Sequence, residues 1–177
     1  MMLLEERPAS LRPRRDIDRL LDVARLGLDR EQPRPFLQRV VDEVAEALHA
    51  PIAVADVLLD DVQVFAALHG PAPQWLLDAG GTPIEWSFCR PFLTERRPRI
   101  VRDLREDPRW SDNPLVTGEG ARAYIGVPLI SRRGHVLGGL CALDLAPRDF
   151  AGESIGMLER RAAEIIDNLE SEAAAEL

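Results

Sequence analysis

Residues 86–144 read WSFCRPFLTERRPRIVRDLREDPRWSDNPLVTGEGARAYIGVPLISRRGHVLGGLCALD, and this stretch decides the fold class. Its first part, residues 87–94, has the spacing of a short helix. A turn-rich segment follows at residues 106–120, where Asp, Asn, Pro and Gly are frequent. Two apolar runs then come at residues 121–131 and 136–145, and together they predict a pair of long neighbouring strands.

The two apolar runs are joined by Arg133-Gly134, which predicts an antiparallel hairpin with a longer loop. Pro128 lies inside the first run. Because its nitrogen cannot donate a hydrogen bond, we expect an edge position or a bulge there. Residues 99–104 predict a further short strand on the other side of the turn-rich segment.

Upstream of this stretch, a second strand pair is predicted. Residues 52–59 are almost continuously apolar, with Asp56 as the single polar residue inside the run. Residues 62–68 return with β-branched side chains after the turn at Asp60-Asp61. Residues 74–85 predict a short helix and a turn.

Helical periodicity appears at both ends of the chain. Apolar residues recur with helical spacing over residues 17–28 and 37–48, and Asp16 is expected to cap the first helix. A last helix is predicted over residues 153–170, and we expect Asp149 to serve as its N-cap. Its apolar residues follow a short heptad seam: Ile155, Leu158, Ala162, Ile165 and Leu169.

The order of elements predicts the α+β class, because neighbouring antiparallel strands are flanked by helices gathered at the two ends. We divide the chain into a loose tail at residues 1–15, an N-terminal helix and linker at 16–35, one domain at 36–170 and a C-terminal tail at 171–177. The length of 177 residues suits one domain of this kind.

Composition excludes several kinds of function. The net charge of −8 argues against nucleic acid or an anionic membrane as the main partner. All 22 basic residues are Arg, so chemistry that needs a Lys amine is excluded. We find neither a signal peptide nor a membrane-spanning run, and we expect a cytoplasmic protein. Two cysteines are too few for a disulfide framework or a metal cluster, and no metal site is predicted.

The central stretch resembles the GAF domain family. Five motifs in one order carry the resemblance, and they are Ser87-Phe88-Cys89, Asp107-Pro108-Arg109-Trp110, Asp112-Asn113-Pro114, Tyr124-Ile125-Gly126-Val127-Pro128-Leu129, and Gly138-Gly139-Leu140-Cys141 with Asp144. The resemblance implies an antiparallel sheet of five to six strands. It also implies that N- and C-terminal helices pack on one face of that sheet and that a ligand pocket lies on the other face.

The family layout also implies a set of pocket residues. The apolar candidates are Trp86, Phe88, Phe92, Trp110, Tyr124 and Leu143, and the polar candidates are Asp103 and Asn113. Residues 90–109 hold seven Arg against four acids. Arg102 is therefore a candidate contact for an anionic ligand or an acidic partner. The alternative is a solvated surface on which these arginines balance nearby acids.

Cys89 and Cys141 have two interpretations. GAF-fold enzymes that reduce free methionine sulfoxide use clustered cysteines, which makes a thiol redox enzyme the alternative function. Those enzymes have three cysteines, whereas this chain has two that lie 52 positions apart. We therefore expect two small buried hydrophobic residues.

The cofactors of other GAF domains are not indicated here, and no cofactor is identified. Neither cysteine is followed by the His of a bilin attachment site. A chain without Lys does not match the full cyclic-nucleotide motif of phosphodiesterases. A haem would need an axial His, yet the three histidines are expected at the ends of elements: His49, His69 and His135.

The resemblance predicts a stand-alone, non-enzymatic module for sensing or regulation in bacterial signal transduction. We expect an unidentified small-molecule ligand and a separate signalling output protein as partners. We also expect a homodimer formed through the terminal helices, using the seam Ile17, Leu20 and Ala24 and the seam of the last helix. A GAF domain that has lost its ligand and only dimerises is a further alternative.

Overall fold

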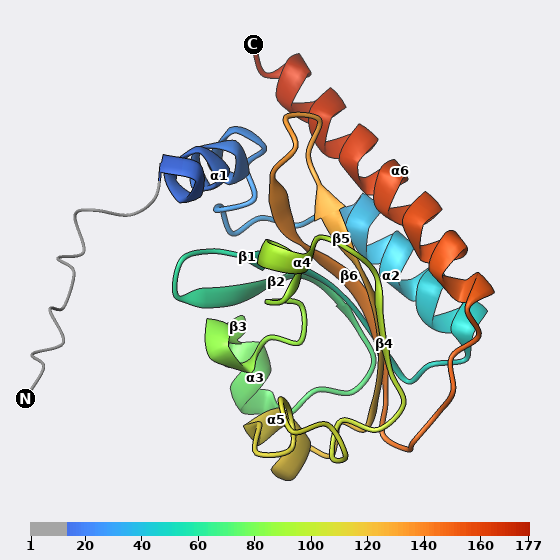
Figure 1. Cartoon of the computed structure of the whole chain (residues 1–177). Coiled ribbons are helices and arrows are strands. Elements are labelled where there is room, and N and C mark those ends of the chain that lie inside the picture. The colour runs from blue at the N-terminus through green and yellow to red at the C-terminus, as the bar shows by residue number, and fades with distance from the viewer. Residues whose placement is uncertain (1–13) are drawn as a thin grey trace, which may run out of the picture.

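The computed structural model describes residues 14–177, which form one antiparallel sheet flanked by helices. The six strands lie in the order β3-β2-β1-β6-β5-β4, and this confirms the α+β class (Figure 1). The elements in chain order are α1 (Arg14–Arg25), α2 (Pro35–Leu48), β1 (Ile52–Leu58), β2 (Val62–His69), α3 (Gln74–Ala79), β3 (Gly81–Pro83), η1 (Ile84–Trp86), α4 (Phe92–Glu95), β4 (Arg99–Val101), α5 (Pro114–Thr117), β5 (Ala123–Ile130), β6 (Val136–Asp144) and α6 (Glu153–Ala175).

Helices α2 and α6 lie side by side on one face of the sheet (Figure 1). They bury the main hydrophobic core against alternate residues of the central strands, because successive side chains of a strand point to opposite faces. The most deeply buried members of this core include Val40, Val41, Val44, Ile125, Leu137, Leu140, Leu158, Ile165 and Leu169. The heptad seam of α6 is therefore used inside the chain, where it packs on the sheet and on α2.

The other face of the sheet is covered by the short elements α3, α4 and α5 and by the segments between them (Figure 1). A second hydrophobic cluster forms there, and it is built from Val54, Phe88, Cys89, Phe92, Leu104, Trp110, Val116, Tyr124 and Cys141. The sheet thus separates two apolar layers, one under the long helices and one under the short elements.

Several expected boundaries differ from those observed. The helix predicted over residues 87–94 is shorter, since only α4 is helical and Ser87 begins a turn. The Ser87 Oγ accepts a hydrogen bond from the Cys89 N–H at 3.1 Å, which is a local turn rather than a helix cap. The strand β3 at residues 81–83 was not expected, because three residues carry no periodic signal.

Pro128 occupies the edge-like position that its chemistry requires. Strand β5 lies between β6 and β4, but pairing with β4 ends at Arg99 opposite Gly126. Pro128 is two residues beyond that point, so on this side its missing N–H leaves no ladder bond unmade. The register also shifts between Leu129 and Ile130, which places a bulge next to the proline.

The two expected helix caps were wrong. Helix α1 begins at Arg14, so Asp16 lies in its first turn rather than at its N-cap. Helix α6 has Gly152 at its N-cap, without a side-chain hydrogen bond, and Asp149 pairs instead with the Arg102 guanidinium. Irregular chain and a turn at Gly152 separate Asp149 from the first residue of α6.

The ends of the described chain are helical. Helix α6 continues to Ala175, which includes most of the segment 171–177 that was expected as a tail. The tail expected at residues 1–15 lies outside the described residues, apart from Arg14 and Arg15 at the start of α1. None of the helices within residues 14–177 has the length and apolar character needed to cross a membrane.

Helix α1 is held by buried polar contacts. The Arg19 guanidinium donates to the carbonyl oxygens of Leu58, Leu59 and Val136. Asp22, which is almost fully buried, accepts hydrogen bonds from Ser131 and Arg25 and contacts His135 Nδ1 at 3.0 Å. These bonds lower the pKa of the Asp22 carboxyl despite its burial. Helix α1 is therefore fixed to the sheet by hydrogen bonds as well as by the burial of Val23 in the main core.

Candidate functional site

A cavity of about 410 Å³ lies on the face of the sheet opposite α2 and α6. Strands β1, β2 and β6 form its floor, while α3, the turn after η1 and the segment around α5 form its walls. Its lining is mainly apolar and consists of Ile52, Val54, Asp56, Gln63, Phe65, Leu68, Pro71, Ala72, Pro73, Leu76, Phe88, Cys89, Leu115, Glu119, Ala121, Cys141, Leu143 and Leu145.

The two-residue period of the strands explains which residues reach the cavity. Ile52, Val54 and Asp56 alternate along β1 and face the cavity, while the residues between them belong to the helix-facing core. In the same way Cys141 and Leu143 of β6 face the cavity. Since Val54 pairs with Cys141 across the two strands, the cavity-facing side chains of β1 and β6 stand side by side.

Among residues 14–177, Asp56 is the only carboxylate on the floor of the cavity, and 1% of its surface is exposed. Its Oδ1 accepts a hydrogen bond from the Gly139 N–H at 2.7 Å. Burial raises the pKa of Asp56 to about 7, although hydrogen bonds from Cys89 and Gly139 act in the opposite direction. A carboxyl group with such a pKa changes its charge near neutral pH.

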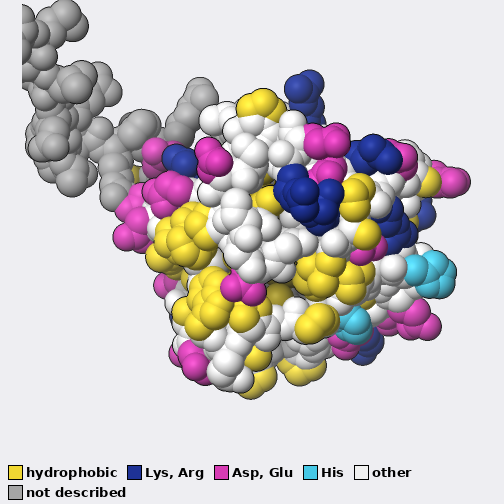
Figure 2. All heavy atoms as spheres, turned by 90° about the horizontal axis from the view of Figure 1, so that it is seen from below, with side chains coloured by type: hydrophobic (Ala, Val, Ile, Leu, Met, Phe, Trp, Pro, Cys, Tyr) yellow, Lys and Arg dark blue, Asp and Glu magenta, His cyan; other side chains and the backbone are white. Residues whose placement is uncertain are grey.

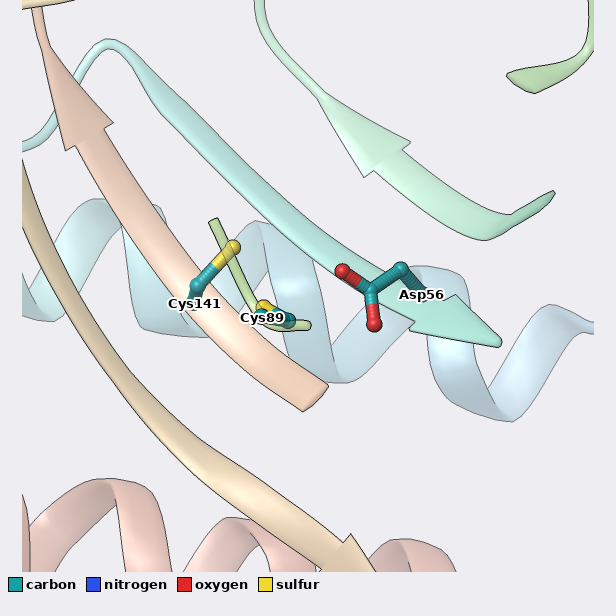
Figure 3. Close-up of side chains that lie close together, drawn as sticks. All are labelled: Asp56, Cys89 and Cys141. Carbon is teal, nitrogen blue, oxygen red and sulfur yellow. The ribbon is translucent and has the colours of Figure 1, made fainter. Parts of the chain in front are cut away.

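Cys89 and Cys141 lie beside Asp56, so the fold joins residues that are far apart in sequence. One ligand atom of each of the three residues lies within 4.8 Å of the others (Figure 3). The Cys89 Sγ also contacts the Tyr124 hydroxyl at 3.3 Å. Burial raises the pKa of the Cys89 thiol, and it likewise raises the pKa of Tyr124. Both groups are therefore protonated at neutral pH.

Small residues make this close packing possible. A Cβ added at Gly139 would lie 2.6 Å from the Cys89 Sγ and 3.1 Å from Cε2 of Phe92. A Cβ added at Gly126 would collide with the Tyr124 hydroxyl. The two glycines thus leave the space in which the thiol and the phenol meet.

A buried hydrogen-bond chain holds the turn that carries Cys89. The Ser87 hydroxyl donates to the Gln63 Oε1 at 2.6 Å, and the Gln63 amide donates to the Thr82 Oγ1 at 3.1 Å. The Ser87 Oγ also accepts from the Cys89 N–H. The position of Cys89 is therefore set by residues of β2 and β3 as well as by its own turn.

Two of the six apolar candidates from the sequence, Phe88 and Leu143, line the cavity. The ring of Phe88 packs edge-on against Trp110 at 5.1 Å between centroids. Phe92, Trp110 and Tyr124 are buried in the cluster behind the cavity wall. Trp86 lies next to α3, where its ring is 6.2 Å from that of Trp75.

The polar candidates lie away from the cavity lining. Asp103 accepts two hydrogen bonds from Arg122, at 2.8 and 2.6 Å, and this pairing lowers the pKa of Asp103 to about 2. Asn113 caps α5 by accepting from the Leu115 N–H at 2.9 Å, and its amide donates to the Trp86 carbonyl. Arg102 is 61% exposed and pairs with Asp149 on the surface.

The pocket residues predicted from the sequence did not include Asp56, either cysteine or the residues at the cavity mouth. The signal for Asp56 was available, because it is the one polar residue in a buried apolar run. The mouth is formed by Leu68, Pro71, Pro73 and Leu145 together with other residues of the lining. The face of the molecule that carries α3 and α5 shows hydrophobic side chains gathered in patches between charged groups (Figure 2).

Comparison with known protein families shows to which family the chain belongs. The model of the GAF domain matches residues 32–166, which is most of the chain. The chain belongs to the GAF domain family. Its fold, with long helices on one face of the sheet and a cavity on the other, is the one that the resemblance implied.

One curated GAF relative is a cyclic di-GMP phosphodiesterase of Pseudomonas aeruginosa, which is 34% identical over 139 residues. The match covers 77% of this chain and 23% of the phosphodiesterase. The chain therefore spans about a quarter of the length of that relative.

Two solved structures show the same fold. One is a free methionine-R-sulfoxide reductase from Neisseria meningitidis, in complex with its substrate. It has a TM-score of 0.65 and 19% identity, and the match covers 93% of this chain and 95% of that chain. The other is the GAF domain of a phosphoenolpyruvate-protein phosphotransferase from Acinetobacter, with a TM-score of 0.63, 16% identity, and coverage of 94% and 100%.

Proposed function

We propose that this GAF domain is a non-enzymatic sensor that binds a small molecule in the cavity between β1, β2, β6 and the short elements. The cavity itself is the observation that carries the proposal. Its volume of about 410 Å³ falls in the range of ligand pockets, and most of its lining is apolar with a few convergent polar groups. Protein cores are normally close-packed, so an apolar cavity of this size favours a binding role over a packing defect.

The chemistry of the lining favours an uncharged, mainly apolar ligand over the anionic ligand that the arginine excess suggested. No arginine within residues 14–177 lines the cavity, whereas two acids, Asp56 and Glu119, do. An anion placed there would meet negative charge without a compensating cation. The Gln63 amide, the Asp56 carboxyl and the two thiols supply polar contacts that would orient a neutral ligand.

Ligand binding can be tested with neutral organic probes. The untagged protein is screened by thermal shift against a set of uncharged and anionic small molecules of matched size. We expect uncharged apolar compounds to raise the melting temperature, and Leu143→Arg to abolish the increase because the added side chain fills the cavity. The matched control Leu77→Arg changes an exposed position on α3 outside the lining. A screen in which only anions bind, or in which Leu143→Arg has no effect, would sink the proposal.

A ligand signal would be passed to an output protein through the helices at the ends of the domain. The C-terminal end of α6 extends beyond the sheet, and α1 contacts α6 near that end through Arg25 and Glu170 (Figure 1). Both helices therefore change position if the sheet or its hairpins move. We place this signalling module in the cytoplasm, a compartment in which two neighbouring buried thiols would remain reduced. The phosphodiesterase relative supports a regulatory role beside a larger output region.

A homodimer remains part of the proposal, but of the two seams expected to form it only the one on the first helix is exposed. The seam of α6 is buried within the chain, whereas Ile17 and Leu21 of α1 are 47% and 63% exposed. Exposed apolar side chains on the outer side of a helix are a suitable contact for a second copy. We therefore assign the dimer contact to α1.

A second candidate function is a thiol redox enzyme that reduces free methionine sulfoxide. The juxtaposition of Cys89 and Cys141 at the cavity floor favours it, and structural neighbours with this name have the same fold. In such a reaction two thiols become one disulfide, the sulfoxide becomes a thioether, and its oxygen leaves as water.

The enzyme candidate is tested by incubating the reduced protein with free methionine-R-sulfoxide and dithiothreitol and measuring methionine by chromatography. We expect no turnover, because burial holds the Cys89 thiol protonated and the thiolate is the nucleophile. Turnover that is lost in Cys89→Ser or Cys141→Ser would replace the sensor proposal by the enzyme.

A further inference from the structure

The floor of the cavity gathers three side chains of the types that bind thiophilic metal ions. Asp56 comes from β1, Cys141 from β6, and Cys89 from the turn between η1 and α4, so three separate segments converge on one point (Figure 3). One ligand atom from each residue lies within 4.8 Å of the other two. All three residues line the cavity, which provides a path by which an ion can enter.

We propose that Asp56, Cys89 and Cys141 bind one divalent metal ion of the zinc class, with the fourth coordination position open to the cavity. Thiolate and carboxylate are ligands of zinc, and three protein ligands with one open position are typical of exchangeable tetrahedral sites. Metal–ligand bonds of about 2.0–2.3 Å place donor atoms about 3.4–3.8 Å apart. The three groups therefore need to approach one another by only about 1 Å.

The neighbours of the three ligands have the arrangement that orients metal ligands. The Gly139 N–H holds Asp56 Oδ1 at 2.7 Å, and the Tyr124 hydroxyl lies 3.3 Å from the Cys89 Sγ. Hydrogen-bond partners of this kind orient the side chains that bind the metal directly. Substitution of such a partner typically weakens metal binding. The Ser87 hydroxyl adds a third contact, because it holds the Cys89 backbone.

The local charge also favours a cation. The partners of the Asp56 carboxyl in the described chain, the Gly139 N–H and the Cys89 thiol, are uncharged. Buried carboxylates are normally paired with a cation or coordinate a metal. A divalent ion would supply that positive charge at the floor of the cavity, among otherwise apolar walls.

Binding converts both thiols to thiolates. The two protons leave to solvent through the cavity, a third follows from any Asp56 that was protonated, and no electron is transferred. Two thiolates and one carboxylate leave the site with one net negative charge around a divalent ion. A water molecule or a neutral donor atom of a ligand then completes the tetrahedron. The metal site does not depend on an organic ligand, so its test is separate from that of the sensor proposal.

The test uses untagged protein that has been treated with a chelator and kept reduced with a phosphine. Cobalt(II) is titrated in as a spectroscopic probe, and zinc is then added in competition. We expect one cobalt per chain, a thiolate-to-cobalt absorption band in the near ultraviolet, visible bands typical of tetrahedral cobalt, and loss of all these bands with zinc. At least two protons per ion should be released in weakly buffered solution.

Variants connect the signal to the three residues. We expect Cys89→Ala and Cys141→Ala each to weaken cobalt binding at least about 100-fold, and Asp56→Asn about 10-fold or more. Asp103→Asn is the matched control, because Asp103 is a buried acid outside the cavity and should leave the affinity unchanged. Far-ultraviolet circular dichroism of the metal-free variants checks their fold.

Results on the unmodified protein decide the question even if a cysteine variant does not fold. Bound zinc should protect both thiols from alkylation, which a site outside the cavity would not do. If the wild-type protein shows no thiolate-to-cobalt band, or if the band survives in a folded cysteine variant, the proposal is overturned. The three residues would then be a hydrogen-bonded part of the core and no more.

Discussion

Arg25 and Glu170 form a bidentate ion pair that joins α1, the first helix of the described chain, to α6, the last. The Arg25 Nη1 lies 2.8 Å from Glu170 Oε2, and its Nη2 lies 3.0 Å from Oε1. The same guanidinium also donates to Asp22, a buried residue of α1 itself. This pair lowers the pKa of Glu170 and ties together the two helices at the ends of the domain.

We expect Glu170→Gln to lower the free energy of unfolding by about 1–2 kcal/mol, a value between those of exposed and buried ion pairs. Urea denaturation at neutral pH measures this change. Because the pKa of Glu170 is lowered in the folded state, its stabilisation is present above the unfolded pKa and is lost as pH falls through the folded value. The exposed Glu176→Gln is the control, and an equal loss in that variant would contradict the assignment.

The raised pKa of Asp56 makes the stability of the metal-free protein depend on pH near neutrality. A carboxyl with a folded pKa of about 7 stabilises the fold most below its unfolded pKa of about 3.8, and this contribution is lost as pH rises through 7. Stability should therefore fall by about 1–2 kcal/mol between about pH 6 and about pH 8.5. Denaturant titrations at several pH values measure this slope.

Two variants separate this effect from other titrations. Asp56→Asn keeps an oxygen for the Gly139 N–H and should remove most of the slope. Asp103 is ionised throughout this pH range, because Arg122 lowers its pKa to about 2. Asp103→Asn should accordingly lower stability while leaving the slope unchanged. A slope that persists in Asp56→Asn would show that another group titrates.

Gly139 leaves the space in which Cys89 packs against the sheet. In Gly139→Ala the new methyl group would lie 2.6 Å from the Cys89 Sγ, so the turn at residues 87–91 must move. We expect a loss of about 1–3 kcal/mol in the free energy of unfolding, as for overpacked cores. Gly152→Ala is the matched control, because nothing lies within 4 Å of a Cβ at that position. Similar stability of the two variants would refute the close packing.

The exposed strip of α1 predicts the behaviour of a surface variant. We expect Leu21→Arg to convert a dimer into a monomer near 20 kDa, which is about the mass of one chain. Size-exclusion chromatography with light scattering at micromolar concentration measures the mass. Leu77→Arg, which changes an exposed leucine of α3, should leave the dimer intact. A wild-type protein that is already monomeric would remove α1 from consideration as a dimer contact.

The sequence predicted the fold class and most strands because their signals are local. Strand β5, strand β6 and the hairpin between them follow from alternation and from Gly134 in the turn. The family motifs placed the helices and the cavity on opposite faces. The three-residue strand β3 was missed, because its pairing depends on β2 rather than on its own residues.

The candidate site was less predictable, because it depends on which strands become neighbours. Strand β6 pairs with β1, and that register sets Val54 opposite Cys141 and Asp56 opposite Gly139. Nothing within residues 52–58 or 136–144 alone specifies this pairing. The predicted polar residues Asp103 and Asn113 instead satisfy local partners, as acids and amides next to turns often do.

The three backbone carbonyl groups that accept hydrogen bonds from Arg19 connect the cavity floor to helix α1. Leu58 ends β1 two residues after Asp56, Leu59 follows it directly, and Val136 begins the strand that carries Cys141. One guanidinium therefore donates hydrogen bonds to both β1 and β6, two strands of the cavity floor. Any sliding of β1 against β6 must tilt α1 or break a buried hydrogen bond. The orientation of α1 therefore depends on the relative position of the two strands beneath the cavity.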